Sequence, residues 1–345
     1  MSVYLNGNPA RWLMNECGQE MRYLCVRDIF APVMGGKAVN EEYEKLRASR
    51  EYGIFFSATG DGVLGDRKRF DLVGRGAMSR FAEAVARGYD RREPAVRQTA
   101  GFISQKCRGD SGGFIMNWRP PIEAACVTGA MVRRLLEAGF DDDSTEHGMA
   151  WIRTRQRHDG GWLHCPIAGS LDVVRLLLLR KAGTGLSREY DHAVGSCVFA
   201  TFECLMALIE YGERRGTREE AADRALDFLL ENRLFTDSLR GATTVCAAGG
   251  RHSDFSRPAY SVFLQYDIVS GLIAVARAGR FGDGRENGAF NSMLSLQNPD
   301  GSFPPGRGGP GMPGGGRRTG RDPWVTLNAL RFMTRAGLVR PEDLI

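Results

Sequence analysis

The heptapeptide Gln156-Arg157-His158-Asp159-Gly160-Gly161-Trp162 indicates how this chain folds. A glycine pair supplies the positive φ that ends a helix, and the aromatic residue behind the pair can stack back on the turn. Related sequences recur from Gln297 to Phe303 and, with three extra residues, from Gln105 to Phe114. A glycine turn that recurs at the ends of helices indicates a repeat architecture.

Helical segments of two kinds alternate along the chain. The more apolar segments are 77–87, 123–138, 196–211, 260–278 and 323–336. The more charged segments are 93–105, 145–156, 217–233 and 284–297. An inner helix is covered on all sides, whereas an outer helix shows one face to water. The alternation therefore predicts an all-α protein, an (α/α) toroid or barrel of inner and outer helices joined by Gly-rich turns.

The toroid domain is expected over 77–337, and the other segments surround or interrupt it. An N-terminal helical extension is expected over 1–50, an irregular Gly-rich excursion over 51–76, and a short tail over 338–345. The insert 168–191 includes an apolar run, which predicts an extra helix packed over the central cavity of the toroid. The Gly/Pro-rich segment 304–323 predicts a flexible loop, acting either as a lid or as a linker.

Helix starts are also predicted from the sequence. Asp143-Ser144 precedes the outer helix expected at 145. Thr217 to Glu220 matches the sequence motif of a capping box before the next outer helix.

Composition limits the partners and the location of the protein. Its 345 residues are 43% hydrophobic, enough for one large core. No apolar run of about 18 residues and no signal segment is found, which predicts a cytoplasmic protein without a transmembrane segment. The net charge of +5 comes from dispersed arginines. This distribution argues against nucleic acid as a partner and allows peripheral contact with an anionic membrane surface.

The inner helices can be aligned on the glycines that are expected to end them, Gly139, Gly212, Gly279 and Gly337. The residues 13 positions earlier are Cys126, Phe199, Tyr266 and Trp324. Three of these four are aromatic, and they fall in the first turns of successive inner helices. We expect them, together with Trp162, to line a central cavity as substrate-binding residues; alternatively, the aromatic rings fill the seams between helices.

The turns and the helix spacing resemble the prenyltransferase and squalene-cyclase repeat family. The likeness is strongest to small bacterial squalene-cyclase-like proteins and covers roughly residues 75 to 337. Its motifs are Asp159 to Trp162, Gly195-Ser196, Tyr266 to Leu272, and Trp324 to Leu330. The resemblance implies a terpene cyclase-like or prenyltransferase-like lyase, isomerase or transferase. Its substrate would be an isoprenoid or another apolar small molecule held in an aromatic-lined cavity.

The chain departs from that family at the residues that perform the chemistry. The Asp-x-Asp-Asp acid of protonating cyclases and the Asp-Asp-x-x-Asp metal motif do not occur in the sequence. Gly195 stands where protein prenyltransferases have the aspartate of their zinc-binding Asp-x-Cys. Asp267, beside Tyr266 at the start of an apolar helix, is the candidate acid/base, because burial would raise its pKa; alternatively, it caps a helix end.

Two other functions remain open from the sequence. Cys165 and Cys197, with His164 or His192 and Asp267, could hold one divalent metal, zinc or iron, for a lyase, hydrolase or transferase acting on a smaller polar substrate. In a variant of this hypothesis, Cys165 or Cys197 is a thiolate nucleophile. A non-catalytic lipid- or protein-binding toroid is the third hypothesis.

Overall fold

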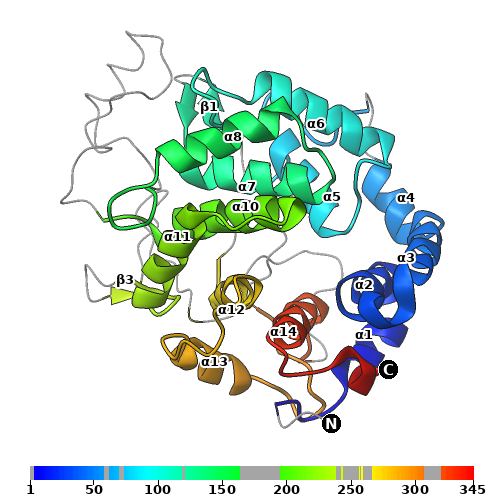
Figure 1. Ribbon diagram of the computed structural model, residues 1–345. Helices are drawn as coiled ribbons and strands as arrows, with labels where there is room; N and C mark the ends of the chain where they lie inside the picture. The colour runs from blue at the N-terminus through cyan, green and yellow to red at the C-terminus, as the bar shows by residue number, and fades with distance from the viewer. Residues whose placement is uncertain are drawn as a thin grey trace.

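The computed structural model describes residues 4–57, 62–69, 74–118, 121–163, 195–237, 242–243, 256, 258, 266–306 and 320–345. These residues are mostly helical (Figure 1). The strands form two short antiparallel pairs, β1 (Ile115–Trp118) with β2 (Pro121–Glu123) and β3 (Thr236–Asp237) with β4 (Ala242–Thr243).

Inner and outer helices alternate as the sequence predicts. The inner helices are α5 (Ala77–Ala86), α7 (Ala125–Glu137), α10 (Val198–Arg215), α12 (Ile268–Arg277) and α14 (Pro323–Arg335). The outer helices are α6 (Pro94–Lys106), α8 (Asp143–Thr154), α11 (Glu220–Glu231) and α13 (Asn287–Leu294). Each inner helix contacts the next inner helix, and each outer helix packs on the inner helix that precedes it. The protein is therefore an α/α toroid, and the expected fold class is confirmed.

The N-terminal helices lie between the last and the first inner helix and complete the ring. They are α1 (Pro9–Glu16), α2 (Gly18–Cys25), the π-helix η1 (Val26–Phe30), α3 (Ala31–Arg47) and α4 (Arg50–Phe56). The last inner helix, α14, contacts α1 and η1, and η1 contacts the C-terminal 3₁₀ turn η2 (Pro341–Leu344), so that the two chain ends lie close together (Figure 1). On the other side, Arg87 after α5 donates to both carboxylate oxygens of Glu20 in α2, at 2.9 and 2.7 Å.

The glycine turns share one hydrogen bond. In each, the amide of the aromatic residue behind the turn donates to a threonine hydroxyl in the first turns of the next inner helix. The three pairs are Phe114 with Thr128 (2.9 Å), Trp162 with Thr201 (3.1 Å) and Phe303 with Thr326 (3.0 Å). The turn glycines Gly112, Gly160 and Gly301 have positive φ of 100°, 84° and 84°. This recurring geometry confirms the predicted repeat.

Two predicted boundaries of α10 and α11 are wrong. Helix α10 passes through Gly212 and ends at Gly216, whose φ is 63°. A Cβ on Gly212 would lie 2.6 Å from the carbonyl oxygen of Thr217, so this glycine allows the returning chain to approach. Thr217 does not cap the next helix, because its amide donates to the Gly212 carbonyl and Glu219 takes the N-cap position.

The stretch 51–76 is less irregular than expected, since α4 continues to Phe56. The Ser49 hydroxyl caps α4 by accepting from the Tyr52 amide, and the rings of Tyr52 and Phe55 pack against Tyr89. The helix expected within 168–191 and most of the 304–323 loop lie outside the described residues. Among the residues that the structure describes, no helix has the length and apolar character needed to cross a membrane.

Candidate functional site

A cavity of about 770 Å³ lies among the inner helices. Its lining comes from the inner helices α5, α7, α10, α12 and α14, from α2, η1, α3 and η2, and from the segment that follows α5. This volume is within the usual range of small-molecule sites, and a toroid places such a site where several helices can contribute side chains.

The lining is strongly charged rather than mainly aromatic. It contains arginines and acids in nearly equal number: Arg27, Arg92, Arg133, Arg134, Arg277, Arg331 and Arg335, with Asp28, Asp90, Glu137, Glu203, Glu210 and Glu213. The expectation of an apolar wall is therefore met only in part. Apolar lining is supplied mainly by Ile29, Val39, Val85, Phe202, Met206, Ile273 and Trp324.

On two inner helices the apolar lining residues precede the charged ones. On α14, Trp324 lies in the first turn and Arg331 and Arg335 near the end; on α12, Ile273 precedes Arg277, the last residue. Arginines in a last turn also interact favourably with the helix dipole. The cavity wall therefore combines arginines near these helix ends with apolar side chains from the earlier turns.

Asp28 joins the N-terminal helices to α14 at the cavity wall. Arg27 donates to it through Nε at 2.5 Å and Nη2 at 3.0 Å, and Arg331 donates through Nε at 2.9 Å. Burial opposes ionisation of this carboxyl, but the two guanidinium groups outweigh burial and lower its pKa to about 2. Arg27 and Asp28 belong to the π-helix η1, and π-helical segments occur frequently at functional sites.

At the ends of α12 and α14, arginines bridge neighbouring helices. Arg277 of α12 donates through Nη2 to Glu210 at 2.7 Å and to Glu213 at 2.6 Å, both on α10. Arg335 of α14 donates to Glu213 at 2.8 Å. These ion pairs hold the ends of three inner helices together around the opening.

Glu137 and Glu203 lie on adjacent helices but have different surroundings. Glu137 accepts from Arg133 Nε at 2.7 Å and from Arg134 Nη1 at 2.5 Å. Burial opposes its ionisation, yet the two arginines hold its pKa below the ordinary range. Glu203, only 4% exposed, lies 3.8 Å from Arg133 Nη1 and makes no side-chain hydrogen bond within the described residues. Burial raises the pKa of Glu203, since Arg133 and Arg134 offset the desolvation only in part.

The aligned residues that were predicted to bind substrate lie at the starts of the inner helices, with Tyr266 just before α12, but only one of them lines this cavity. Trp324 is part of the wall, whereas Cys126, Phe199 and Tyr266 are not. The Tyr266 ring packs against Phe202 with ring centroids 4.7 Å apart, and Phe202 does line the cavity.

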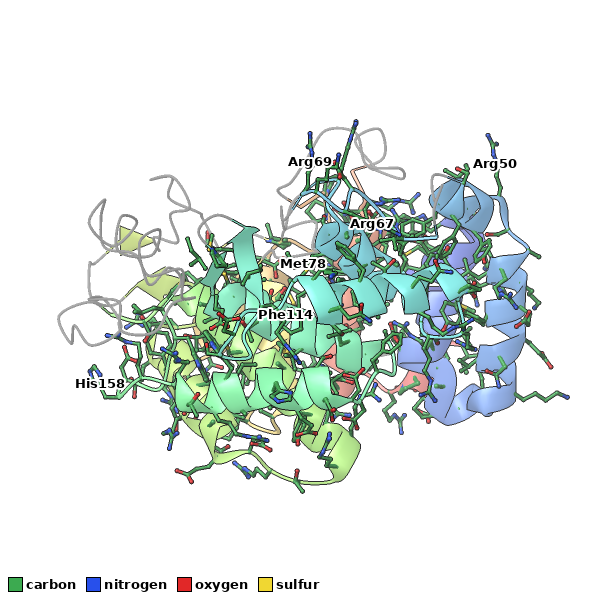
Figure 2. All side chains as sticks on the ribbon, turned by 90° about the horizontal axis from the view of Figure 1, so that it is seen from above. Arg50, Arg67, Arg69, Met78, Phe114 and His158 are labelled. Carbon is green, nitrogen blue, oxygen red and sulfur yellow. The ribbon has the colours of Figure 1, made fainter. Side chains whose placement is uncertain are left out.

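Trp162 is buried in its turn, where Nε1 donates to the Ile152 carbonyl at 2.9 Å. The neighbouring His158 lies at the outer edge of the molecule, whereas Phe114 of the related turn lies among the helices (Figure 2). Substrate contact by Trp162 stays a prediction.

Asp267 is the N-cap of α12. It is 2% exposed, and its carboxylate accepts from the Ser270 amide at 2.7 Å. This is the capping role that the sequence left open beside acid/base catalysis, and Asp267 does not line the cavity. Catalysis by Asp267, with Tyr266 beside it, stays a prediction.

Cys197 is disulfide-bonded in the structure and 8% exposed. A sulfur in a disulfide is neither a thiolate ligand nor a nucleophile until it is reduced. The thiols of Cys17, Cys25, Cys107, Cys126 and Cys204 are free. His164, Cys165 and His192, the other residues of the predicted metal site, lie outside the described residues. Where side chains are described, no group of three or more potential metal ligands occurs.

The charged cavity was not predicted from the sequence, although the sequence contains one residue that points to it. Val198 to Ile209 is apolar or uncharged at every position except Glu203. A single carboxyl in an otherwise apolar inner helix must either pair or carry out chemistry, because burying an unpaired charge is costly.

No protein-family model and no curated protein matches the chain. Among solved structures, a family 105 glycoside hydrolase of C. acetobutylicum ATCC 824 is similar at 13% identity, with 95% of each chain covered and a TM-score of 0.46. The type II terpene cyclase MstE from Scytonema, solved with its product merosterolic acid A, is similar at 11% identity, with 75% of this chain and 86% of the cyclase covered and a TM-score of 0.31.

A protein from Actinoplanes is similar at 15% identity, with 74% of this chain and 88% of that protein covered and a TM-score of 0.30. All three TM-scores lie below 0.5, so the chemistry of this cavity has to follow from its own residues.

Proposed function

We propose that this protein is an α/α-toroid enzyme whose substrate is a small amphiphile with an apolar part and a phosphate or carboxylate group. The observation that carries the proposal is the mixed lining of the cavity, which combines arginines with the apolar side chains of Trp324, Phe202 and Ile273. An isoprenoid phosphate is a molecule of this class.

The arginines support an anionic group on the substrate. Guanidinium groups bind phosphate and carboxylate in a planar, bidentate geometry. Arg27, Arg277 and Arg335 each bind a cavity carboxylate, yet each retains Nη1 without an acceptor among the described residues. An entering anion can use these donors without displacing the acids that hold the helices.

The apolar residues support a hydrocarbon portion of limited length. Trp324 offers an aromatic face, and Met206 and Ile273 add aliphatic surface. Burial of apolar surface contributes about 25 cal/mol per Å², so the chain of an isoprenoid would add substantially to affinity. The resemblance to isoprenoid enzymes noted in the sequence agrees with this apolar lining, and the arginines extend it to a charged head group.

The test is isothermal titration with three probes: farnesyl phosphate, farnesol and inorganic phosphate. We expect farnesyl phosphate to bind at least about tenfold more tightly than either part alone, equivalent to about 1.4 kcal/mol. Arg335→Gln should weaken farnesyl phosphate and leave farnesol unaffected. The matched control is Arg218→Gln, because Arg218 lies just before the outer helix α11 and pairs with Asp223. This variant should change the affinity of neither farnesyl phosphate nor farnesol.

Two results would overturn the proposal. Equal affinity for farnesol and farnesyl phosphate would remove the role of the arginines. Absence of binding of all three probes to wild-type protein would remove this substrate class.

A further inference from the structure

We propose that Glu203 is a neutral carboxylic acid that donates a hydrogen bond to an oxygen of the anion bound in the cavity. The inference rests on the proposed function, because it assigns a chemical role within the same site. It stands on a contrast among the acids that line the cavity.

Every other acid of the cavity wall accepts a hydrogen bond from at least one arginine. Asp28 and Glu137 each bind two, at the distances given above, and Glu210 binds Arg214 at 3.0 Å as well as Arg277. Glu213 binds Arg277 and Arg335, and Asp90 binds Arg92 at 2.8 Å. The arginines therefore occupy the acceptor oxygens of these acids, and they lower the pKa of Asp28 and of Glu137.

Glu203 is the exception within this set. The charged groups that face it are Arg133, Arg134 and Glu137, all on α7. Arg133 directs its Nε to Glu137 and lies over the Phe202 ring at 5.9 Å, which leaves Nη1 3.8 Å from Glu203. A buried carboxyl without a hydrogen-bonded cation favours its neutral form, because burial penalises the charge. Burial accordingly raises the pKa of Glu203.

The backbone beneath Glu203 is held firmly. Helices α7 and α10 touch at Gly129, where a Cβ would lie 2.5 Å from the carbonyl carbon of Glu203. The Cys204 thiol adds a contact to the Ala125 carbonyl at 3.4 Å. A donor on a rigid element keeps its orientation toward the ligand.

Arg133 leaves the second position beside the anion open. A neutral Glu203 has an O–H group that can donate a hydrogen bond to an oxygen of the ligand, and the proton stays on Glu203. A phosphate monoester has a second pKa of about 6, so it does not remove the proton from a carboxyl that remains neutral at pH 7. The negative charge of the ligand further favours the neutral form of Glu203. Arg133 Nη1, 3.8 Å from Glu203, can contact the same anion.

The test is carbon NMR of protein labelled with ¹³C at the glutamate side-chain carboxyl, without ligand and with farnesyl phosphate. We expect one resonance in the protonated position at pH 7, absent from Glu203→Gln. Glu137→Gln, which removes a cavity glutamate bound to two arginines, should instead remove a resonance in the ionised position. Saturating farnesyl phosphate should leave the Glu203 resonance in the protonated position but change its chemical shift, because the carboxyl then donates to the ligand.

The possible failures are distinguishable. Absence of a protonated glutamate in the free protein would overturn the proposal, whatever the ligand does. Binding of farnesyl phosphate that ionises Glu203, or that leaves its resonance unchanged, would overturn the hydrogen bond to the ligand alone. Failure of farnesyl phosphate to bind in the titration would contradict the proposed function and this hydrogen bond together, with the protonation of the free protein still decided by the spectrum.

Discussion

Arg133 lies between two carboxyl groups and hydrogen-bonds only one of them. Its Nε is 2.7 Å from Glu137, whereas its Nη1 is 3.8 Å from Glu203. The pKa values of the two acids accordingly shift in opposite directions, down for Glu137 and up for Glu203. Carboxyl groups whose surroundings separate their pKa values are typical of sites where two acids have different chemical roles.

Glu203→Gln tests the raised pKa through stability. A group whose pKa is higher in the folded state stabilises the fold below its unfolded pKa, ordinarily 4.5 for glutamate, and loses that contribution as the pH rises through the folded value. The variant should therefore gain stability relative to wild type as the pH rises from 4.5 to 8. Urea unfolding at several pH values measures this difference. A gap that narrows or reverses over this range would show that Glu203 is ionised.

Asp28→Asn should have the opposite pH dependence. Its pKa of about 2 lies below the ordinary 3.8, so Asp28 stabilises the fold above pH 3.8 and loses this contribution as the pH falls through about 2. Removal of the charge leaves Arg27 and Arg331 facing each other and should cost about 3 kcal/mol at pH 7. Chemical denaturation at pH 7 and pH 3 provides the comparison. A cost that does not shrink toward pH 3 would argue against the ion pair as its origin.

Thr201→Val tests the hydrogen bond that the glycine turns share. The substitution keeps the shape of the side chain but removes the acceptor for the Trp162 amide, and a buried amide without a partner costs about 1–3 kcal/mol. Thr128→Val and Thr326→Val should behave similarly in their own turns. The control is Thr154→Val, whose exposed hydroxyl bonds only to the Trp151 carbonyl. Equal thermal stability of Thr201→Val and the control would contradict the shared role.

Gly129→Ala and Gly101→Ala form a matched pair. A Cβ at Gly129 would lie 2.5 Å from the Glu203 backbone, so the substitution should force α7 and α10 apart and destabilise the protein by about 1–3 kcal/mol. A Cβ at Gly101, within helix α6, would meet nothing within 4 Å. Alanine there should stabilise by about 0.5–1 kcal/mol. Similar melting temperatures for the two variants would contradict the close helix contact.

The fold was predictable because its signals are local. Gly160 and Trp162 mark a helix end whatever surrounds them, and the alternation of apolar and charged helices depends only on side-chain period. Gly212 was misread as a helix end, because the sequence does not distinguish a glycine that ends a helix from one that admits a neighbouring backbone. The threonines of the turns went unnoticed, although Thr128, Thr201 and Thr326 all lie two residues after the aligned positions.

The site was less predictable because its pairs are distant in sequence. Asp28 meets Arg331 across 303 positions, and such a pairing has no local signature. Asp267 illustrates the reverse case, since a polar residue before an apolar helix fits capping and catalysis equally well. Glu203 could have been selected from its apolar surroundings, but its distant pairing with Arg133 appears only when α7 and α10 are placed side by side.

The most direct test of the account is the affinity of farnesyl phosphate relative to farnesol, measured by titration on wild type, Arg335→Gln and Arg218→Gln. The account predicts a preference of at least about tenfold for the phosphate in wild type and Arg218→Gln, reduced in Arg335→Gln. Equal affinity for the two molecules in wild type would contradict a cavity that recognises an anionic group through its arginines.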